Sequence, residues 1–178
     1  MAYFEQFPKG KYDIKGDKNF KFVTDLFRRI KIRDKIKDVA SLYSEYTIKS
    51  GERPEHVAMK HFGDSQLHWI ILITNGITDA YYDWPLSFQE FEEFLLSKYG
   101  TYENINQPHH YERVQDSGPQ TSIDYSHLIE CDSTDAGAIE ITNLQYEERL
   151  QEEKRRIKLI NTAYLPTIIQ EFERLMNE

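Results

Sequence analysis

The clearest pattern of apolar and polar positions lies between residues 46 and 77. Residues 46–48 alternate with a period of two, which predicts a half-buried strand that ends at Ser50-Gly51. Pro54 suits the first turn of a helix, where its missing N–H leaves no hydrogen bond unmade. Gly63 supplies the left-handed residue that commonly ends a helix. The pattern therefore predicts a strand followed by a short amphipathic helix.

A second helix follows, with Ser65 as its N-cap and the Asn75-Gly76 turn at its end. Large apolar residues on both helices recur at spacings that place them on one side. Together with the strand, the two helices predict a small β-α-α-β unit within residues 44–80. Its expected core residues are Val57, Ala58, Phe62, Leu67, Ile70 and Ile71.

After this unit, Ser87 and Glu90 form the capping-box pair that starts another helix, and Gly100 stops it. From residue 101 to residue 137 the periodicity is weaker and indicates short strands between polar loops. Further strands are predicted at residues 111–114, 123–125, 128–131, 138–142 and 157–160, and further helices at residues 144–155 and 166–176.

Aromatic residues open the chain without a sustained period. Tyr3, Phe4 and Phe7 precede the helix breakers Pro8 and Gly10, so we predict an extended N-terminal arm. These rings are too few to build a core of their own. We expect them to act as anchors that are buried either in a partner or against the outside of the β-α-α-β unit.

The last predicted helix carries a continuous apolar stripe of Ile168, Ile169, Phe172, Leu175 and Met176. Burial of each large apolar side chain is worth roughly 1.5–3 kcal/mol, so the stripe is not expected to remain in water. It must pack either on the chain's own core or on another subunit. The preceding helix is mostly charged and can cover little of the stripe, which favours another subunit.

The net charge of the 178-residue chain is −8, which argues against a nucleic-acid-binding protein. Basic residues are nevertheless concentrated between residues 28 and 37, beginning with Arg28 and Arg29. We favour the solvated face of an amphipathic segment as their role. The second interpretation is a docking surface for an acidic neighbour, and the weakest is binding to a phosphate backbone.

The single cysteine, Cys131, excludes an intrachain disulfide and fits a reducing compartment. No secretory signal is visible at the start of the sequence. The longest apolar run, residues 69–73, is far shorter than the roughly 20 residues of a membrane span. We therefore expect a soluble protein that folds in the cytoplasm and does not bind a membrane.

The histidines offer few candidates for catalysis or metal binding. His68 has no nucleophile motif beside it, so we interpret it as a packing or structural residue. His56 and His61 are five positions apart in the sequence, which does not place both on one helical face. The remaining zinc candidates, whose spacing falls outside the common patterns, are His109, His110, His127 and Cys131.

Glu52, Glu55 and Asp64 surround the predicted unit and would serve glycoside hydrolysis only if two of them flanked a cleft. Surface carboxylates commonly lie this close without such a role. No glycine-rich phosphate loop, G-x-S-x-G motif or C-x-x-C motif is present. We therefore predict no catalytic residue, no cofactor and no bound metal.

Trp84 lies in the run Asp83-Trp84-Pro85-Leu86 and has three interpretations. Its ring covers the core of the unit at a turn, anchors a contact with another protein, or stacks on a sugar. The first interpretation is favoured, and the second follows closely. We therefore retain Trp84 as a candidate interface residue.

The β-α-α-β segment resembles a LysM module, in which a Gly-acid turn follows the first strand and Asn ends the second helix. Arg53 stands where such modules usually have a small polar residue. LysM modules suggest glycan binding, but because of Arg53 and the interface features elsewhere we predict no affinity for chitin oligomers. The residues in register are Gly51, Glu52, Pro54, Val57, Ala58, Phe62, Gly63, Leu67 and Asn75.

The sequence around this segment resembles another family over nearly its full length. The resemblance is to the baseplate wedge subunits of T-even-type contractile-tailed bacteriophages, the gene fifty-three products, which carry an embedded LysM-like module. It is weakest over residues 101–137. The matching runs are Tyr3-Phe4-x-x-Phe7-Pro8, Tyr12-Asp13-Ile14, residues 23–29, residues 68–72, Thr74-Asn75, residues 82–86, Lys98-Tyr99-Gly100 and residues 153–160.

This resemblance implies an α+β fold with a LysM-like β-α-α-β core, an extended N-terminal arm and C-terminal strand and helix elements. We divide the chain into four parts on this basis. They are residues 1–43 (the arm with a short helix or strand), 44–80 (the LysM-like module), 81–137 (the aromatic helix and an irregular region) and 138–178 (the C-terminal strand and helices).

The same resemblance implies a structural component of the virion tail baseplate that is assembled in the host cytoplasm and helps to join wedges around the central hub. Its partners would be other wedge proteins and hub-proximal proteins, with six copies, or a multiple of six, in each baseplate. A module that binds peptidoglycan or N-acetylglucosamine polymers and a tail-associated cell-wall hydrolase are the alternatives. The candidate interface residues are Tyr3, Phe4, Phe7, Arg28, Arg29, Trp84, Ile168, Phe172 and Leu175.

Overall fold

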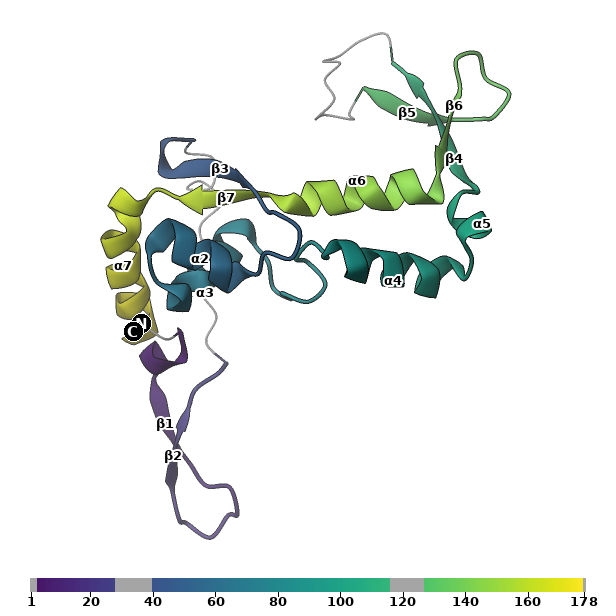
Figure 1. Ribbon diagram of the computed structural model, residues 1–178. Helices are drawn as coiled ribbons and strands as arrows, with labels where there is room; N and C mark the ends of the chain where they lie inside the picture. The colour runs from purple at the N-terminus through teal and green to yellow at the C-terminus, as the bar shows by residue number, and fades with distance from the viewer. Residues whose placement is uncertain (1–2, 28–39, 116–126, 178) are drawn as a thin grey trace. The chain divides into compact units, whose positions relative to one another are not determined.

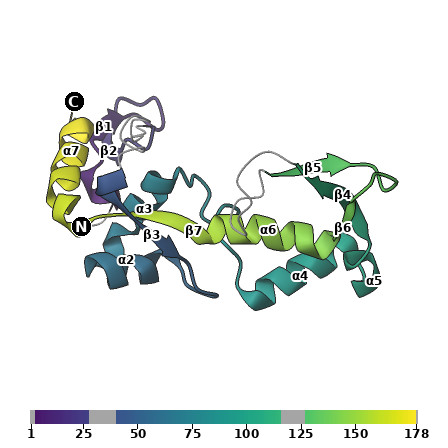
Figure 2. The ribbon, with the colours of Figure 1, turned by 90° about the horizontal axis from the view of Figure 1, so that it is seen from above.

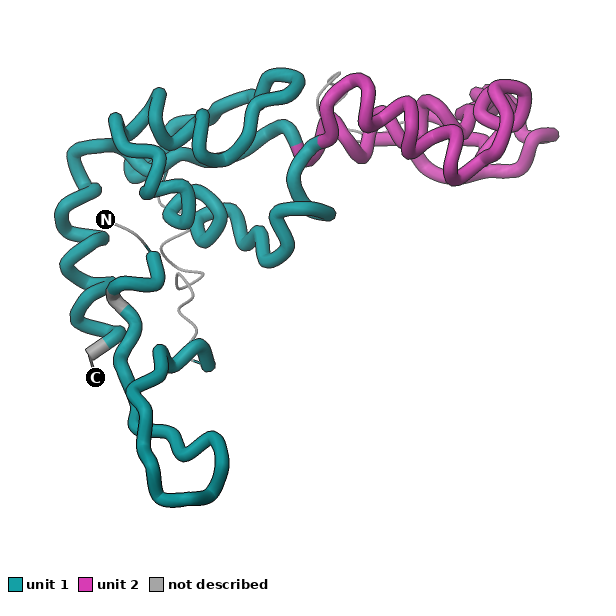
Figure 3. The backbone as a smooth tube through the Cα atoms, turned by 60° about the horizontal axis from the view of Figure 1, so that its bottom comes forward, with its two compact units in different colours: residues 1–85, 155–178 teal, residues 86–154 magenta. Residues whose placement is uncertain are grey.

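The computed structural model describes residues 3–27, 40–115 and 127–177. Helices and strands are mixed along the described chain, which confirms the predicted α+β class. The chain divides into two compact units, residues 1–85 with 155–178 and residues 86–154 (Figure 3). The second unit is therefore inserted into the sequence of the first.

The core of the first unit joins segments from both sides of this insertion. Strand β3 (Tyr43–Thr47) is followed by helix α2 (Pro54–Phe62), the short 3-10 helix η3 (Ser65–Leu67) and helix α3 (His68–Asn75). Strand β7 (Arg156–Ile160) then pairs with β3 in an antiparallel two-stranded sheet. The chain order of this core is thus β-α-α-β.

The position of the second strand corrects the sequence prediction. The β-α-α-β unit was expected within residues 44–80, but residues 76–87 contain only turns, bends and irregular backbone. Ser44 and Leu159, which face each other in the sheet, are 115 positions apart in the sequence. The alternation of residues 157–160 does predict a strand, but a local pattern carries no information about which distant strand it will pair with.

The ends of α2 and α3 follow local chemistry. Gly63 and Gly76 lie just after these helices with φ of 77° and 68°, in the left-handed region that glycine adopts without strain. Asp64, rather than the predicted Ser65, caps the segment between the helices, because its carboxylate accepts a hydrogen bond from the Gln66 N–H at 2.8 Å.

Asn75 fixes the outer edge of β7 to helix α3. Its side-chain oxygen accepts a hydrogen bond from the Lys158 N–H at 2.8 Å, and its Nδ2 donates to the Lys158 carbonyl at 2.9 Å. The same Nδ2 also donates to the Ile71 carbonyl, at 2.9 Å. The Asn75 amide thereby replaces a neighbouring strand at one residue of β7.

Two clusters of buried side chains meet at helix α3. Ala58 is fully buried, as predicted, whereas Phe62 is half-buried and packs against both clusters. Strand β7 contributes to each of them. The first cluster consists of Phe7, Leu67, Trp69, Ile70, Ile160, Phe172 and Met176, and the second of Ile48, Val57, Ala58, Ile71, Trp84, Ile157 and Leu159.

Helix α7 (Leu165–Asn177), which follows the 3-10 turn η4 (Thr162–Tyr164), buries two residues of its apolar stripe within the same unit. Phe172 and Met176 are 3% and 0% exposed, and the ring centroids of Phe172 and Trp69 are 4.3 Å apart. The preference for another subunit as the cover of these two residues was therefore wrong. Helix α3, and not the charged helix that precedes α7 in the predicted order, covers these two side chains.

The N-terminal segment, predicted as an extended arm, contains regular structure. A 3-10 turn, η1 (Tyr3–Gln6), leads to an antiparallel hairpin of β1 (Lys9–Tyr12) and β2 (Lys21–Thr24), and η2 (Ala40–Leu42) precedes β3 (Figure 1). Every residue of the two hairpin strands is exposed. Of the short helix or strand predicted for residues 1–43, the strands β1 and β2 are present, and residues 28–39 lie outside the described part of the chain.

The second unit combines two helices with a small sheet of order β5-β4-β6. Helices α4 and α6 lie side by side in both views (Figures 1 and 2). The capping box of Ser87 and Glu90 is confirmed at the start of α4. Helix α5 was not predicted. The strand expected at residues 123–125 lies outside the described residues. The elements are α4 (Phe88–Tyr99), α5 (Tyr102–Ile105), β4 (Pro108–Val114), β5 (Leu128–Cys131), β6 (Ile139–Thr142) and α6 (Asn143–Arg155).

Polar contacts hold the highly charged helix α6 in the second unit. Glu147 is 3% exposed, and its carboxylate accepts hydrogen bonds from Lys98 at 2.5 Å and Tyr99 at 2.9 Å. Arg149 donates to both carboxylate oxygens of Glu112, each at 2.8 Å. Ion pairs with Lys98 and Glu112 therefore contribute much of what holds this helix in place. Among the described residues, no helix has the length and apolar character needed to cross a membrane.

Replacing Asn75 by alanine is expected to destabilise the first unit by about 1–3 kcal/mol, because its hydrogen bonds to the backbone of Lys158 and to the Ile71 carbonyl are lost. Denaturant unfolding followed by tryptophan fluorescence would measure the change, since Trp69 and Trp84 both lie in this unit. Asn106→Ala is the matched control, because Asn106 is exposed and its side chain bonds only the local Tyr102 carbonyl in the described structure. Equal stabilities of the two variants would contradict the role given to Asn75.

Candidate protein-interaction site

The residues predicted to contact other proteins have very different surroundings in the structure. Phe7, Trp84 and Phe172 are buried within the first unit, where they have little surface left for a partner. Tyr3, Ile168 and Leu175 are half-buried, and Phe4 is 62% exposed. Arg28 and Arg29 lie outside the described residues. The prediction of an interface therefore stays open mainly for Phe4 and the half-buried residues.

The N-terminal rings pack on the chain's own core. The Tyr3 ring centroid lies 4.9 Å from that of Phe7, 5.5 Å from that of Trp69 and 5.6 Å from that of Phe172. Of the two roles predicted for these rings, the structure shows burial against the β-α-α-β core. Phe4 remains at the edge of this aromatic group, where its ring is available to another molecule.

Trp84 closes the second buried cluster. Its indole Nε1 donates a hydrogen bond to the Glu52 carbonyl at 2.7 Å, which satisfies the polar atom of a ring that is otherwise buried among apolar side chains. This is the favoured interpretation, in which Trp84 covers the core at a turn. Its buried ring has no exposed face on which a sugar could stack.

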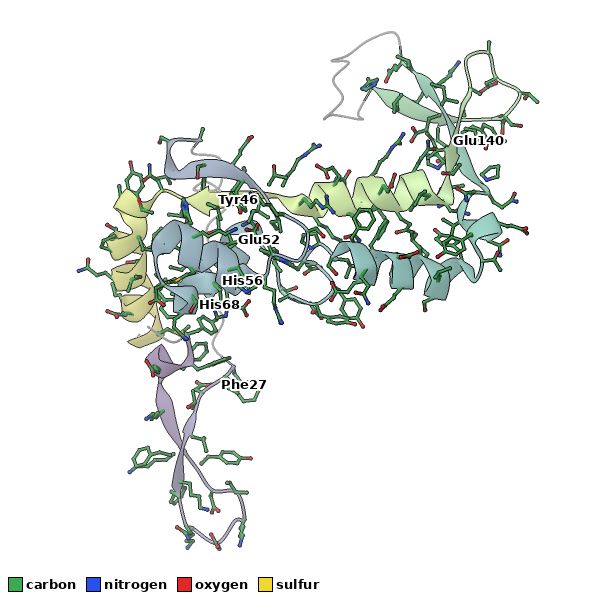
Figure 4. All side chains as sticks on the ribbon, in the orientation of Figure 1. Phe27, Tyr46, Glu52, His56, His68 and Glu140 are labelled. Atoms are coloured by element: carbon green, nitrogen blue, oxygen red, sulfur yellow. The ribbon has the colours of Figure 1, made fainter. Side chains whose placement is uncertain are left out.

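Glu52 lies at the centre of a structural network beside this turn (Figure 4). Its carboxylate accepts hydrogen bonds from the Tyr46 hydroxyl at 2.8 Å and the Lys49 N–H at 3.0 Å, and it forms an ion pair with Lys60. Burial acts to raise the pKa of Glu52, but these donors together lower it to about 2. Burial and the bond to Glu52 raise the pKa of Tyr46 to about 12. A carboxylate so fully used by donors is unsuited to general acid catalysis at neutral pH.

The histidines of the first unit also make local hydrogen bonds. His56 Nδ1 accepts from the Arg53 N–H at 3.3 Å, and ring nitrogens of His61 and His68 lie 2.8 Å and 3.0 Å from the carbonyls of Ile160 and Ser65. The structural interpretation of His68 agrees with this geometry. Within the described ranges, no group of three or more His, Cys, Asp or Glu side chains is arranged to hold a metal ion.

The hairpin β1–β2 is the exposed apolar surface that the sequence prediction missed. Phe22 and Phe27 are 70% and 96% exposed, and they are joined by further exposed apolar residues along the hairpin. A signal for it was available, since apolar and basic residues alternate on both sides of the Gly16 turn. The additional exposed residues are Tyr12, Ile14, Phe20, Val23 and Leu26.

Comparison with known proteins accounts for nearly the whole chain. Residues 3–174 match the family model described as base plate wedge protein 53. The chain belongs to this family. Among curated proteins, it is 27% identical over 171 residues to the baseplate wedge protein gp53 of Enterobacteria phage T4, across 88% of this chain and 85% of that protein.

Membership of the base plate wedge protein 53 family confirms the resemblance found in the sequence. The match covers both compact units and the N-terminal hairpin, so it is not confined to the β-α-α-β core. In this family member, Glu52 and Trp84 make contacts within the fold, and many of the exposed large apolar residues lie between residues 12 and 27.

Replacing Glu52 by glutamine is expected to lower stability by about 1.5–3 kcal/mol near neutral pH, because charged hydrogen bonds are lost. The pKa of Glu52 is lowered from 4.5 to about 2, so its contribution is complete above pH 4.5 and is lost as the pH falls toward 2. The stability difference between the wild type and Glu52→Gln should therefore shrink with acidification. Unfolding free energies measured across this pH range would test the expectation.

Glu45→Gln is the control for this experiment, because Glu45 is exposed on β3. Its effect on stability should be small at every pH. A Glu52→Gln effect that is independent of pH would show that the charge of Glu52 is not what stabilises the turn.

Proposed function

We propose that the protein is a non-catalytic structural subunit of a contractile-tail baseplate, located in the virion. It binds other wedge proteins and hub-proximal proteins and helps to join wedges around the central hub during assembly in the host cytoplasm. The observation that carries this proposal is the family match over residues 3–174. The name of the T4 relative, a baseplate wedge protein, agrees with it.

The use of the polar side chains supports a structural role. Glu52 is bound by its own donors, Glu112 and Glu147 are paired with basic residues, and the first unit's histidines bond to nearby backbone. Side chains that are paired in this way are not available to bind or activate a substrate. Large apolar residues are instead exposed on the hairpin, where a protein partner would bury them.

We further propose that the core of the first unit is a LysM-like module whose second strand is supplied from beyond an insertion. The order β3-α2-α3-β7 and the antiparallel pairing of its strands support this assignment. In this view the module serves as a scaffold and has no affinity for glycans. The long side chain of Arg53, which is exposed beside the turn, agrees with this absence of glycan affinity.

Baseplate incorporation is the direct test of the proposed function. A phage lacking this gene should form complete tails only when a tagged copy is supplied from a plasmid, and the tag should copurify with those tails. Quantification should give six copies, or a multiple of six, for each baseplate, as its rotational symmetry requires. Complete, infectious tails without the protein would contradict the proposal.

Two further measurements address the alternative functions. Purified protein should not be retained by insoluble peptidoglycan and should give no cleared zone in a cell-wall zymogram. Saturable binding to peptidoglycan would favour the glycan-binding module, and a cleared zone would favour the hydrolase. A verified LysM protein and lysozyme provide the positive controls.

A further inference from the structure

The N-terminal hairpin has features of a docking element that lacks its partner. All residues of β1 and β2 are exposed, and large apolar side chains continue to Phe27 beyond the second strand (Figure 4). A two-stranded hairpin is at best marginally stable by itself in water. Clustered exposed apolar residues commonly mark an interaction surface. A partner that covers the hairpin would therefore stabilise it.

Both faces of this hairpin present a cation beside an aromatic ring. Lys11 lies opposite Phe22, and its Nζ is 5.8 Å from the centre of the Phe22 ring. The next pair along the ladder, Tyr12 and Lys21, faces the other side of the sheet, because successive side chains alternate. The surface that suits the hairpin should accordingly be both acidic and partly apolar.

The carboxylates of the hairpin segment are used in its turns. Residues 9–27 contain five lysines and three aspartates. Each aspartate accepts hydrogen bonds from nearby backbone N–H groups, and the excess of lysines over aspartates leaves the segment with a net charge of +2. The bonds run from Lys15, Gly16 and Lys18 to Asp13, from Asn19 to Asp17, and from Phe27 to Asp25.

The second unit of the chain carries the opposite charge. Residues 86–154 contain fifteen acidic and four basic residues, a net charge of −11. Because the whole chain is at −8, the first unit is at +3. Two of the four basic residues are already paired, Lys98 with the buried Glu147 and Arg149 with the half-buried Glu112. Basic residues therefore neutralise little of the negative charge of the second unit.

The sheet β5-β4-β6 combines acidic residues with exposed apolar groups. Glu130 on β5 and Glu140 on β6 are exposed, and Figure 4 labels Glu140. Val114 and Ile139 are exposed as well. β5 and β6 are the outer strands, and each pairs on one side only within the described residues. Such edges accept added strands, and opposite charges across the new ladder favour the pairing.

We propose that the hairpin of one copy of the protein docks on the acidic sheet of a second copy, head to tail. The contact joins different surfaces of the two copies, so its repetition produces a ring or an open chain rather than a closed pair. This inference rests on the proposed function in one respect, namely that a baseplate brings several copies of the protein together.

Self-association of the purified full chain tests the proposal. Sedimentation should show a mass above that of the monomer at low salt, which decreases as salt is raised from about 0.05 M to about 0.5 M. Lys11→Glu with Lys21→Glu should remain monomeric, whereas Lys11→Arg with Lys21→Arg should associate like the wild type. Circular dichroism checks that each variant is folded.

A charge exchange makes the test independent of any loss of hairpin structure. Glu130→Lys with Glu140→Lys should also be monomeric alone. When this variant is mixed with Lys11→Glu and Lys21→Glu, association should return, because each hairpin then meets a sheet of opposite charge. A mixture that stays monomeric would contradict the assigned surfaces.

Carbodiimide cross-linking identifies the contact, because this reagent joins lysine amines directly to carboxylates. An equal mixture of isotopically light and heavy protein should yield cross-links between the hairpin lysines and Glu130 or Glu140 that contain one peptide of each kind. Cross-links found only within single chains would overturn the proposal in favour of docking inside one molecule.

A wild-type protein that remains monomeric at low salt and high concentration would also overturn this inference. Its incorporation into tails would then still support the proposed function. Conversely, a protein that associates as described but is absent from tails would leave the head-to-tail contact standing and remove the proposed function.

Discussion

Strand β7 pairs with β3 only after the chain has passed through the whole second unit, and both buried clusters of the first unit depend on residues of β7. β7 brings Ile157, Leu159 and Ile160 into the two buried clusters. Its other edge is held by Asn75 at the end of α3. Closing so long a loop costs conformational entropy, although this cost increases only slowly with loop length. The insertion is therefore compatible with a stable core.

Buried and partly buried polar groups give both units much of their geometry. In the first unit, Glu52 joins the strand β3 to the helix α2 through Tyr46 and Lys60, and its carbonyl binds Trp84. In the second unit, Glu147 joins α6 to the end of α4. An ion pair of this kind adds little net stability, but removal of one partner would leave a buried charge. These groups consequently favour one arrangement of the helices over others.

The distribution of charge along the chain is as informative as its total. A net charge of −8 suggests a uniformly acidic protein, yet half of the acidic residues lie in the second unit. The N-terminal hairpin, in contrast, has more lysines than aspartates. Complementary surfaces of this kind guide association and limit wrong contacts more than they add affinity. The basic hairpin and the acidic second unit would suit the head-to-tail contact that we propose.

Local chemistry determined the elements that the sequence could reveal by itself. Gly63, Gly100 and the Ser87–Glu90 capping box end or begin helices through bonds within a few residues, and the strand at residues 157–160 follows from alternation. Family membership could also be read from short runs of residues. Tertiary structure alone decided that β7 is the partner of β3, that α3 covers Phe172, and that Phe7 is buried while Phe27 is exposed. These outcomes depend on segments distant in sequence coming together, and a pattern of neighbouring residues does not encode which surfaces will meet.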